Sequence, residues 1–308
     1  MIENSGARSR GGSVGASYIG EAGLIGASIN QLDKQYGIPS DGMAEPAVTV
    51  DLRQTKYDFK SQLNQPFDFA ETLKLKFGYT DYQHTELDGG LPATQFLNKT
   101  YSSRLELEQK RFGVLTGKLG FQSTNSDFSA LDNNGSSVLV PKTQTDSYAL
   151  FALESLKAGN VSYELGLRGE WVTLTPENQQ RQVYLPISGS ASATWDIDTE
   201  NQLSFTATHT QRAPQVQELY YDGVHEATRS YELGNTNLSK EFSNNLDVAY
   251  RFNTDWMNVQ ANVFHNWVSN YIYQQRADYF FNRDTETFEV TCSSACLPVE
   301  ISQQQGAT

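Results

Sequence analysis

The sequence predicts an all-β fold, an antiparallel transmembrane β-barrel of which this chain forms a part. Apolar and polar residues alternate with a period of two along most of the 308 residues, and successive side chains of a strand point to opposite faces. The connections between these segments are short and long in turn, as in barrels that cross an outer membrane. No window approaches the roughly 18 consecutive apolar residues of a membrane-spanning helix, so strands are expected to do the crossing.

The alternation is clearest in residues 161–173. Val161 and Leu165 share one face of this segment, while Ser162 and Glu164 share the other. The same rule predicts fourteen strands, and the third and fourth exceed the roughly 9–11 residues that cross a bilayer. The predicted strands are 12–19, 24–32, 47–63, 69–85, 97–110, 114–128, 144–156, 161–173, 185–197, 202–211, 240–252, 257–273, 278–284 and 299–308.

The lengths of the connections favour a barrel over a soluble sandwich or propeller. An outer-membrane barrel has short periplasmic turns and long extracellular loops, whereas a soluble β fold gives no reason for such an alternation. The short connections are 20–23, 64–68, 111–113, 157–160, 198–201 and 253–256, and the long ones are 33–46, 86–96, 129–143, 174–184, 212–239 and 274–298.

The polar face of each strand is expected to line the lumen. Arg104, Glu106 and Glu108 share one such face, and a lipid-facing Arg or Lys would cost roughly 2–4 kcal/mol at the midplane. Aromatic residues near strand ends suit the interfacial girdles of a membrane protein. These residues are Tyr18, Tyr57, Tyr79, Trp171, Trp195, Trp256 and Trp267.

The composition excludes other classes of protein. Lys and Arg total 23 against 36 Asp and Glu, which gives a formal net charge of −13; no nucleic-acid partner is expected, because phosphate binding needs a basic face. The aromatic fraction of 12% argues against disorder. The N-terminus lacks the apolar segment of a secretory signal, and both ends look cut, so residues 1–308 are expected to be a fragment.

A more specific pattern lies in the second half of the chain. It comprises Arg212-Ala213-Pro214, Glu218-Leu219-Tyr220, Gly223-Val224-His225-Glu226-Ala227-Thr228, Tyr231-Glu232-Leu233-Gly234-Asn235, Leu238, Glu241 and Ser243-Asn244-Asn245. This pattern resembles the mid-barrel signature of TonB-dependent outer-membrane receptors, most closely the branch that includes zinc-uptake receptors. Further agreement comes from Tyr36-Gly37-Ile38-Pro39, Asp51-Leu52-Arg53, Asp81-Tyr82-Gln83-His84-Thr85-Glu86 and Asn270-Tyr271-Ile272-Tyr273.

The resemblance implies a barrel of roughly 22 strands with a plugged lumen, located in the bacterial outer membrane. It implies uptake of a scarce ligand with energy from the TonB complex. With about fourteen predicted strands, the chain is expected to be part of the barrel domain only, without the plug, the coupling box or the last strands. Outer-membrane lipid and the TonB complex, reached through the missing plug region, are the expected partners.

Two histidine-plus-carboxylate groups are the candidate metal ligands. His84 lies beside Glu86 at the outer end of a predicted strand, and His225 lies with Asp222 and Glu226 in the long loop 212–239. Neutral imidazole and carboxylate are suitable zinc ligands, so the two groups are expected to supply one extracellular site. The alternative is that each histidine orders its own loop through hydrogen bonds.

The remaining candidates are expected to be structural. His209 and His265 lie on the apolar faces of their strands, where an interfacial aromatic also fits. Cys292 and Cys296 are expected to form a disulfide in an extracellular, oxidising loop, with thiolate metal binding as the alternative. Residues that the resemblance shares across ligand classes are expected to fold the loop rather than choose the ligand: Arg212, Pro214, Glu218, Glu232, Gly234 and Glu241.

The sequence therefore predicts a receptor that imports zinc or a metal complex. The loop at 40–46 contains no histidine, so metal capture by that loop, as in similar zinc receptors, is not expected. A siderophore or other chelate receptor is the first alternative, using the aromatic residues of the loops: Tyr220, Tyr221, Tyr279, Phe280 and Phe281. A passive porin-like channel or adhesin is the second. No enzyme is expected, because no Gly-x-Ser-x-Gly, Walker or His-Glu-x-x-His motif occurs. We expect this fragment not to fold alone, because an incomplete barrel exposes two strand edges in lipid.

Overall fold

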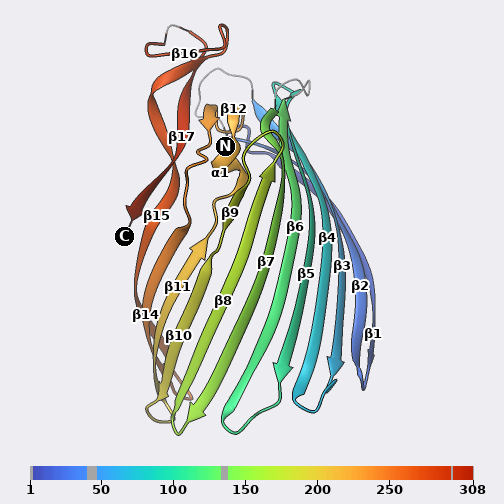
Figure 1. Ribbon diagram of the computed structural model, residues 1–308, viewed down its shortest axis with the longest axis vertical. Coiled ribbons are helices and arrows are strands. Elements are labelled where there is room, and N and C mark those ends of the chain that lie inside the picture. Colours follow the sequence, from blue (N-terminus) through green and yellow to red (C-terminus); the bar gives the residue numbers. More distant parts are fainter. Residues whose placement is uncertain (1–2, 40–46, 133–137, 293, 308) are drawn as a thin grey trace.

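The computed structural model describes residues 3–39, 47–132, 138–292 and 294–307. They form a single sheet that curls about an axis along its strands (Figure 1). The long strands are β1 (Ala7–Gly20), β2 (Gly23–Gly37), β3 (Val48–Asn64), β4 (Ala70–Asp88), β5 (Leu91–Gln109), β6 (Leu115–Asp132), β7 (Val138–Ala158), β8 (Val161–Pro176), β10 (Ile187–Asp196), β11 (Asn201–Arg212), β14 (Glu241–Asn253), β15 (Asn258–Asn282) and β17 (Cys296–Ala307). The short elements are β9 (Gln182–Tyr184), α1 (Val216–Tyr220), β12 (Asp222–His225), β13 (Ser230–Leu233) and β16 (Thr287–Glu289).

The long strands pair as an antiparallel meander. Each pairs with the next in the chain, with β8 beside β10 and β11 beside β14 across the inserted short elements. The short turns gather at one end of the sheet and the long connections at the other (Figure 1). The predicted all-β antiparallel architecture is confirmed.

Two details of the predicted pattern are wrong. Residues 257–273 and 278–284 are parts of one strand, β15, which runs for 25 residues and absorbs irregularities in its pairing with β17. The predicted loop 86–96 is a tight turn, in which Gly89 and Gly90 have φ values of 55° and 85°, a region that favours glycine. Above the membrane neither face of a hairpin meets lipid, so backbone pairing continues where the apolar alternation has ended.

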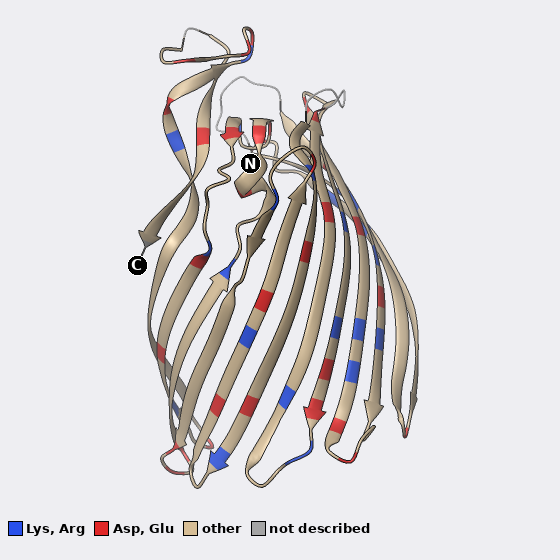
Figure 2. Ribbon diagram, in the orientation of Figure 1, with Lys and Arg blue, Asp and Glu red and all other residues tan. Residues whose placement is uncertain are grey.

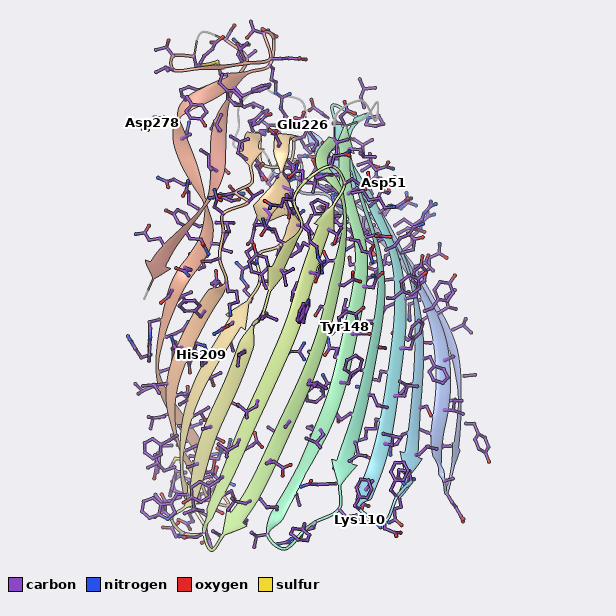
Figure 3. All side chains as sticks on the ribbon, viewed as in Figure 1. Asp51, Lys110, Tyr148, His209, Glu226 and Asp278 are labelled. Atoms are coloured by element: carbon purple, nitrogen blue, oxygen red, sulfur yellow. A yellow bond between two sulfur atoms is a disulfide. The ribbon has the colours of Figure 1, made fainter. Side chains whose placement is uncertain are left out.

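A row of tyrosines marks the outer edge of the membrane band. The rings of Tyr57, Tyr79 and Tyr101 lie side by side on neighbouring strands, with centroids 6.1 and 4.6 Å apart, and Tyr148 lies at mid-height on β7 (Figure 3). At about 3.3 Å per residue and a tilt of roughly 40°, residues 69–79 cover about 25 Å, the height of the apolar band of such barrels. The part of β4 beyond Tyr79 therefore lies outside the bilayer.

The segment 212–239, predicted as a long extracellular loop, folds back against the sheet as an inner layer. It contains α1, β12 and β13, which lie within the curve of the sheet (Figure 1). Leu219 and Tyr220 of α1 pack with Val140 and Leu174 of the lumen wall in one buried cluster. Among the described residues, no helix is long and apolar enough to cross a membrane.

Candidate functional site

The candidate site lies where the outer end of β4 meets the hairpin of β12 and β13. Even-numbered residues of β4 face the lumen, so His84 and Glu86 project inward, beyond the tyrosine row. His225 ends β12, and Glu232 lies on β13, the returning strand. Residues far apart in the sequence thus share one wall at the extracellular end.

Two glycines allow the inner layer to approach the sheet closely. A Cβ on Gly223 of β12 would lie 2.2 Å from Leu139 Cδ2. A Cβ on Gly234 would lie 2.5 Å from the backbone carbon of Leu219 and from the backbone nitrogen of Tyr220. A larger residue at Gly234 would push the layer away, because its neighbours are backbone atoms, whereas at Gly223 the Leu139 side chain would have to move.

His225 lies between two carboxylates. Its Nε2 is 3.2 Å from Glu86 Oε1, and its Nδ1 is 2.7 Å from Glu232 Oε1. Burial alone would lower the pKa of His225, but the hydrogen bonds and charges of Glu232 and Glu86 outweigh it and raise the pKa to about 9. The ring is therefore an imidazolium at neutral pH and donates a hydrogen bond from each ring nitrogen.

Glu232 and Glu86 are both buried, but they differ in how far their oxygens are hydrogen-bonded. Glu232 also accepts a hydrogen bond from Thr228 Oγ1 at 2.8 Å. Burial would raise its pKa, but His225 outweighs that and lowers it. Glu86 is 2% exposed, and its second oxygen, Oε2, has no hydrogen-bond partner, like the buried hydroxyl of Tyr221. Unpaired buried polar atoms are costly, so this corner carries unused capacity to bind a polar group.

His84 lies on the same wall but, unlike His225, is uncharged at neutral pH. Its Nδ1 is 2.9 Å from the hydroxyl oxygen of Tyr82, and its ring stacks on Phe96 at 4.4 Å between centroids. Burial lowers the pKa of His84, so the ring is neutral at neutral pH. Phe96 also contacts the ring of His225, at 5.7 Å, and therefore links the two histidines.

The other two predicted ligands point elsewhere. Asp222 accepts a hydrogen bond from the Tyr231 hydroxyl at 2.7 Å. Glu226, at the extracellular end (Figure 3), pairs with Arg283 at 2.6 Å. In the described part of the chain, no three His, Cys, Asp or Glu side chains are arranged to hold a metal ion. The structure thus places His84, Glu86 and His225 on one wall, where His225 forms ion pairs with Glu86 and Glu232 and the neutral His84 lies beside them.

Arg212 connects the inner layer to the sheet. Its guanidinium forms paired hydrogen bonds to Glu218, at 2.9 and 3.0 Å, and to Glu241, at 3.0 and 3.1 Å. Glu218 also accepts a hydrogen bond from the backbone nitrogen of Gln215 at the start of α1. These contacts agree with the predicted role of the shared motif in folding the segment.

The two remaining histidines have local partners. His209 Nδ1 lies 2.7 Å from Asn244 Oδ1, and Gln211 Nε2 lies 3.0 Å from His209 Nε2. The ring of His265 packs 5.3 Å from that of Trp267. Both arrangements are of the structural kind expected from the sequence.

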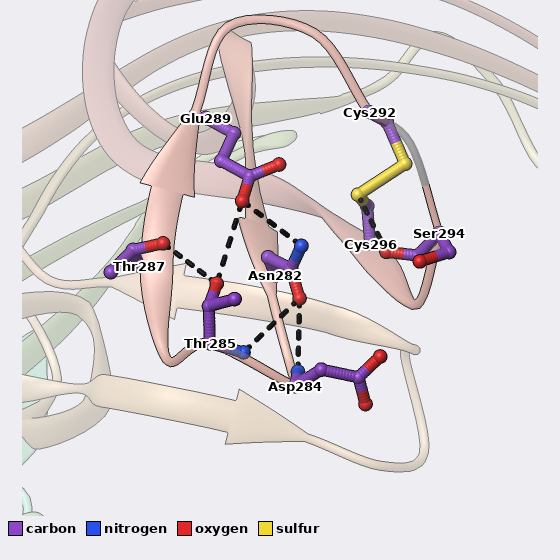
Figure 4. The surroundings of a disulfide bond; sticks show 8 residues. All are labelled: Asn282, Asp284, Thr285, Thr287, Glu289, Cys292, Ser294 and Cys296. Atoms are coloured by element: carbon purple, nitrogen blue, oxygen red, sulfur yellow. Dashed lines mark hydrogen bonds between the residues drawn. A yellow bond between two sulfur atoms is a disulfide. The ribbon is translucent and has the colours of Figure 1, made fainter.

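Cys292 and Cys296 form a disulfide at the tip of the β15–β17 hairpin (Figure 4). Beside it, Asn282 Oδ1 accepts hydrogen bonds from the backbone nitrogens of Asp284 and Thr285, while Asn282 Nδ2 donates to Glu289 at 3.0 Å. The sulfurs are therefore bonded to each other rather than available as thiolates. The predicted histidine-free loop, 40–46, lies outside the described residues.

Sequence reasoning missed two members of the site. Glu232 was expected only to fold the loop, and Tyr221 was counted only among aromatic residues for a chelate. A hairpin over 222–233 pairs His225 with Ser230 and Gly223 with Glu232, so His225 and Glu232 lie diagonally on one face. The contact of His225 with Glu86 joins residues 139 apart and has no local signal in the sequence.

Residues 4–294 match the family described as TonB dependent receptor-like, beta-barrel. Among solved structures, the copper transporter OprC is 13% identical and superposes with a TM-score of 0.78, over 98% of this chain and 49% of that one. The FrpB iron transporter from Neisseria meningitidis is 9% identical, with a TM-score of 0.73 over 98% of this chain and 48% of its own.

A third similar structure is the Serratia marcescens hemophore receptor HasR, in complex with its hemophore HasA and heme. It is 15% identical, with a TM-score of 0.69 over 97% of this chain and 49% of that one. At these identities the likeness shows the fold alone. The chain spans about half the length of these structures.

Proposed function

The chain belongs to the TonB-dependent receptor family, and from that premise we propose that the complete receptor imports a metal ion or metal complex. The predicted family and the predicted bacterial outer-membrane location are confirmed, and the family is one of receptors rather than enzymes. Similarity to the zinc-uptake branch stays a prediction. Coupling to the TonB complex through a plug is part of the proposal.

The cargo class rests on the similar structures and on the site. Those proteins are a copper transporter, an iron transporter and a hemophore receptor in complex with heme. In the described part of this chain, a neutral His84 and the buried, unpaired Oε2 of Glu86 lie on the inner side of β4 beside His225. Imidazole and carboxylate are ligands for zinc and similar ions, which favours an ion as the first candidate.

We propose that His84, Glu86 and His225 bind zinc after His225 gives up its proton and the three side chains, which lie on one wall but are not arranged as a metal site in the described residues, close around the ion. A metal ligand must be a neutral imidazole, so zinc and the proton compete for His225, whose pKa is about 9. Asp222 and Glu226 can become zinc ligands only if the β12–β13 hairpin moves, because both carboxylates have other partners. Zinc affinity is therefore expected to increase from pH 7 to pH 9.

The test is chelator competition for zinc by the complete receptor in detergent. The double variant His84→Ala/His225→Ala is expected to lose roughly 3 kcal/mol of binding free energy, about a hundredfold. The matched control, His209→Ala/His265→Ala, also removes two histidines and is expected to bind as the wild type does. A wild-type receptor that ignores zinc at pH 7 and pH 9 would exclude this metal site.

A chelate cargo is the second candidate because of one observation. The rings of Tyr279, Phe281 and Phe288 on the extracellular hairpin form a contacting cluster with Tyr231 of β13, with centroids 4.3–5.7 Å apart. Apolar and aromatic walls suit organic ligands. If zinc does not bind, a set of ferric chelates tested against Phe281→Ala/Phe288→Ala decides between a chelate receptor and a passive channel or adhesin.

A further inference from the structure

Three basic residues face each other across neighbouring strands in the middle of the lumen wall. Lys60 on β3 lies directly opposite Lys76 on β4, and Lys76 lies directly opposite Arg104 on β5. The blue bands of these strands lie close together in the lower half of the sheet (Figure 2). Like charges directly opposite one another destabilise a sheet, so this row is unfavourable unless an anion joins it.

Among the described residues, one of the three has a carboxylate partner. Arg104 pairs with Glu106 at 2.9 Å and donates to Gln122 at 3.1 Å. In the described ranges, Lys60 and Lys76 have no carboxylate within ion-pair distance and no side-chain hydrogen bond, whereas nearby Lys74 pairs with Glu108 at 3.0 Å. In the part of the chain that the structure describes, two ammonium groups therefore lack a counter-charge.

The two lysines border a hollow of about 380 Å³. Gly78 lies two residues beyond Lys76 on the same face, and a Cβ there would lie 3.0 Å from Ser102 Oγ, so the absence of a side chain opens the space. The one carboxylate lining the hollow, Asp58, is paired with Lys56 at 3.0 Å. The hollow thus presents two free ammonium groups and a hydroxyl.

The geometry points to a binding site for a carboxylate anion at this hollow. Each ammonium offers three donors to carboxylate oxygens, and Ser102 Oγ lies within the same hollow. A polycarboxylate would relieve the repulsion of the row from both sides. The carboxylates can come from a free solute in the lumen or from another segment of the complete receptor that enters the barrel. This inference is independent of the proposed zinc site.

The experiment is calorimetric titration of the complete receptor in detergent at low salt, with citrate as the probe. Lys60→Gln/Lys76→Gln is compared with Lys99→Gln/Lys157→Gln, which removes the same charge from positions outside the hollow. A thermal melt of each variant accompanies the titration. Zinc binding should be the same in both variants, so failure here is distinguishable from failure of the zinc proposal.

Two results support the site and tell its sources apart. Citrate binding by the wild type that weakens at least tenfold only in the Lys60/Lys76 variant indicates a free anion. No citrate binding, with a Tm lowered only in that variant, indicates a carboxylate supplied by the receptor itself. Equal citrate binding by both variants overturns the proposal, as does absence of citrate binding with an unchanged or raised Tm.

Discussion

The membrane-spanning wall and the inner layer at 212–239 are held together in different ways. The wall is a series of hairpins between sequence neighbours, each with a continuous ladder of backbone pairs. The inner layer has a buried apolar cluster and a short pairing of β13 with β17, and it is tied to the sheet by a few ionic contacts. Arg212 with Glu218 and Glu241 is one of these, and His225 with Glu86 is another, across 139 residues. Stability is therefore distributed in the wall and concentrated in the inner layer, so single substitutions should separate the two.

The largest effect is expected from Arg212→Ala. The change leaves Glu218 and Glu241, both largely buried, without their shared cation. Removing one partner of such a group costs about 3–5 kcal/mol when burial is complete, so a loss of about 3 kcal/mol is expected here. Hydrogen exchange over residues 216–240 of the complete receptor measures it. The variant should still migrate on a gel as a heat-modifiable barrel. An equal loss of hydrogen-exchange protection in the strands of the wall would show that Arg212 does not act on the inner layer alone.

The next largest effect is expected from pH at His225. Its pKa is raised from 6.5 in the unfolded chain to about 9 in the structure. Because folding raises the pKa of His225, the protonated ring stabilises the inner layer fully below pH 6.5. This contribution is lost as the pH rises through 9. The loss should be on the order of 2–3 kcal/mol.

Hydrogen exchange of the β12–β13 hairpin tests this expected loss of stability between pH 6.5 and 9. The rates are corrected for the intrinsic pH dependence of amide exchange. In the wild type, protection should fall between pH 6.5 and pH 9.5. In His225→Gln, protection should be low and nearly independent of pH. Parallel pH profiles for the two proteins would show that His225 does not hold the hairpin.

A smaller effect is expected from Gly234→Ala. The new methyl group would meet the backbone of Leu219 and Tyr220 at 2.5 Å, so the layer must shift. Overpacking of this kind costs about 1–3 kcal/mol. The control is Gly169→Ala on the wall, where no atom lies within 4 Å of the added carbon. The rate of limited proteolysis in 212–239 should rise only for Gly234→Ala.

The smallest effect is expected from Arg53→Ala, the counterpart of the first substitution on the wall. Arg53 pairs with Asp33 at 3.1 Å, but their side chains are 65% and 46% exposed. Exposed ion pairs contribute about 0–1 kcal/mol, so the Tm of the complete receptor should barely change. A loss as large as that of Arg212→Ala would remove the distinction between the two regions.

Much of the site was within reach of the sequence, and part of it was not. Residue type and predicted extracellular position indicate His84, Glu86 and His225 as candidate metal ligands, and the structure places these three on one wall. The same two criteria also indicate Asp222 and Glu226, which contact Tyr231 and Arg283 instead. Adjacency in the chain does not decide which way a side chain points once a hairpin forms, and the hairpin β12–β13 sends these two away from Glu86.

The sequence by itself determined the wall. Alternating side chains point to opposite faces because of local backbone geometry, so a period of two is enough to separate an apolar outer face from a polar lumen. Only the tertiary structure decided that 212–239 folds inward and that His225 becomes an imidazolium between Glu86 and Glu232. That outcome depends on burial and on contacts across 139 residues, and no local pattern encodes a long-range contact of this kind.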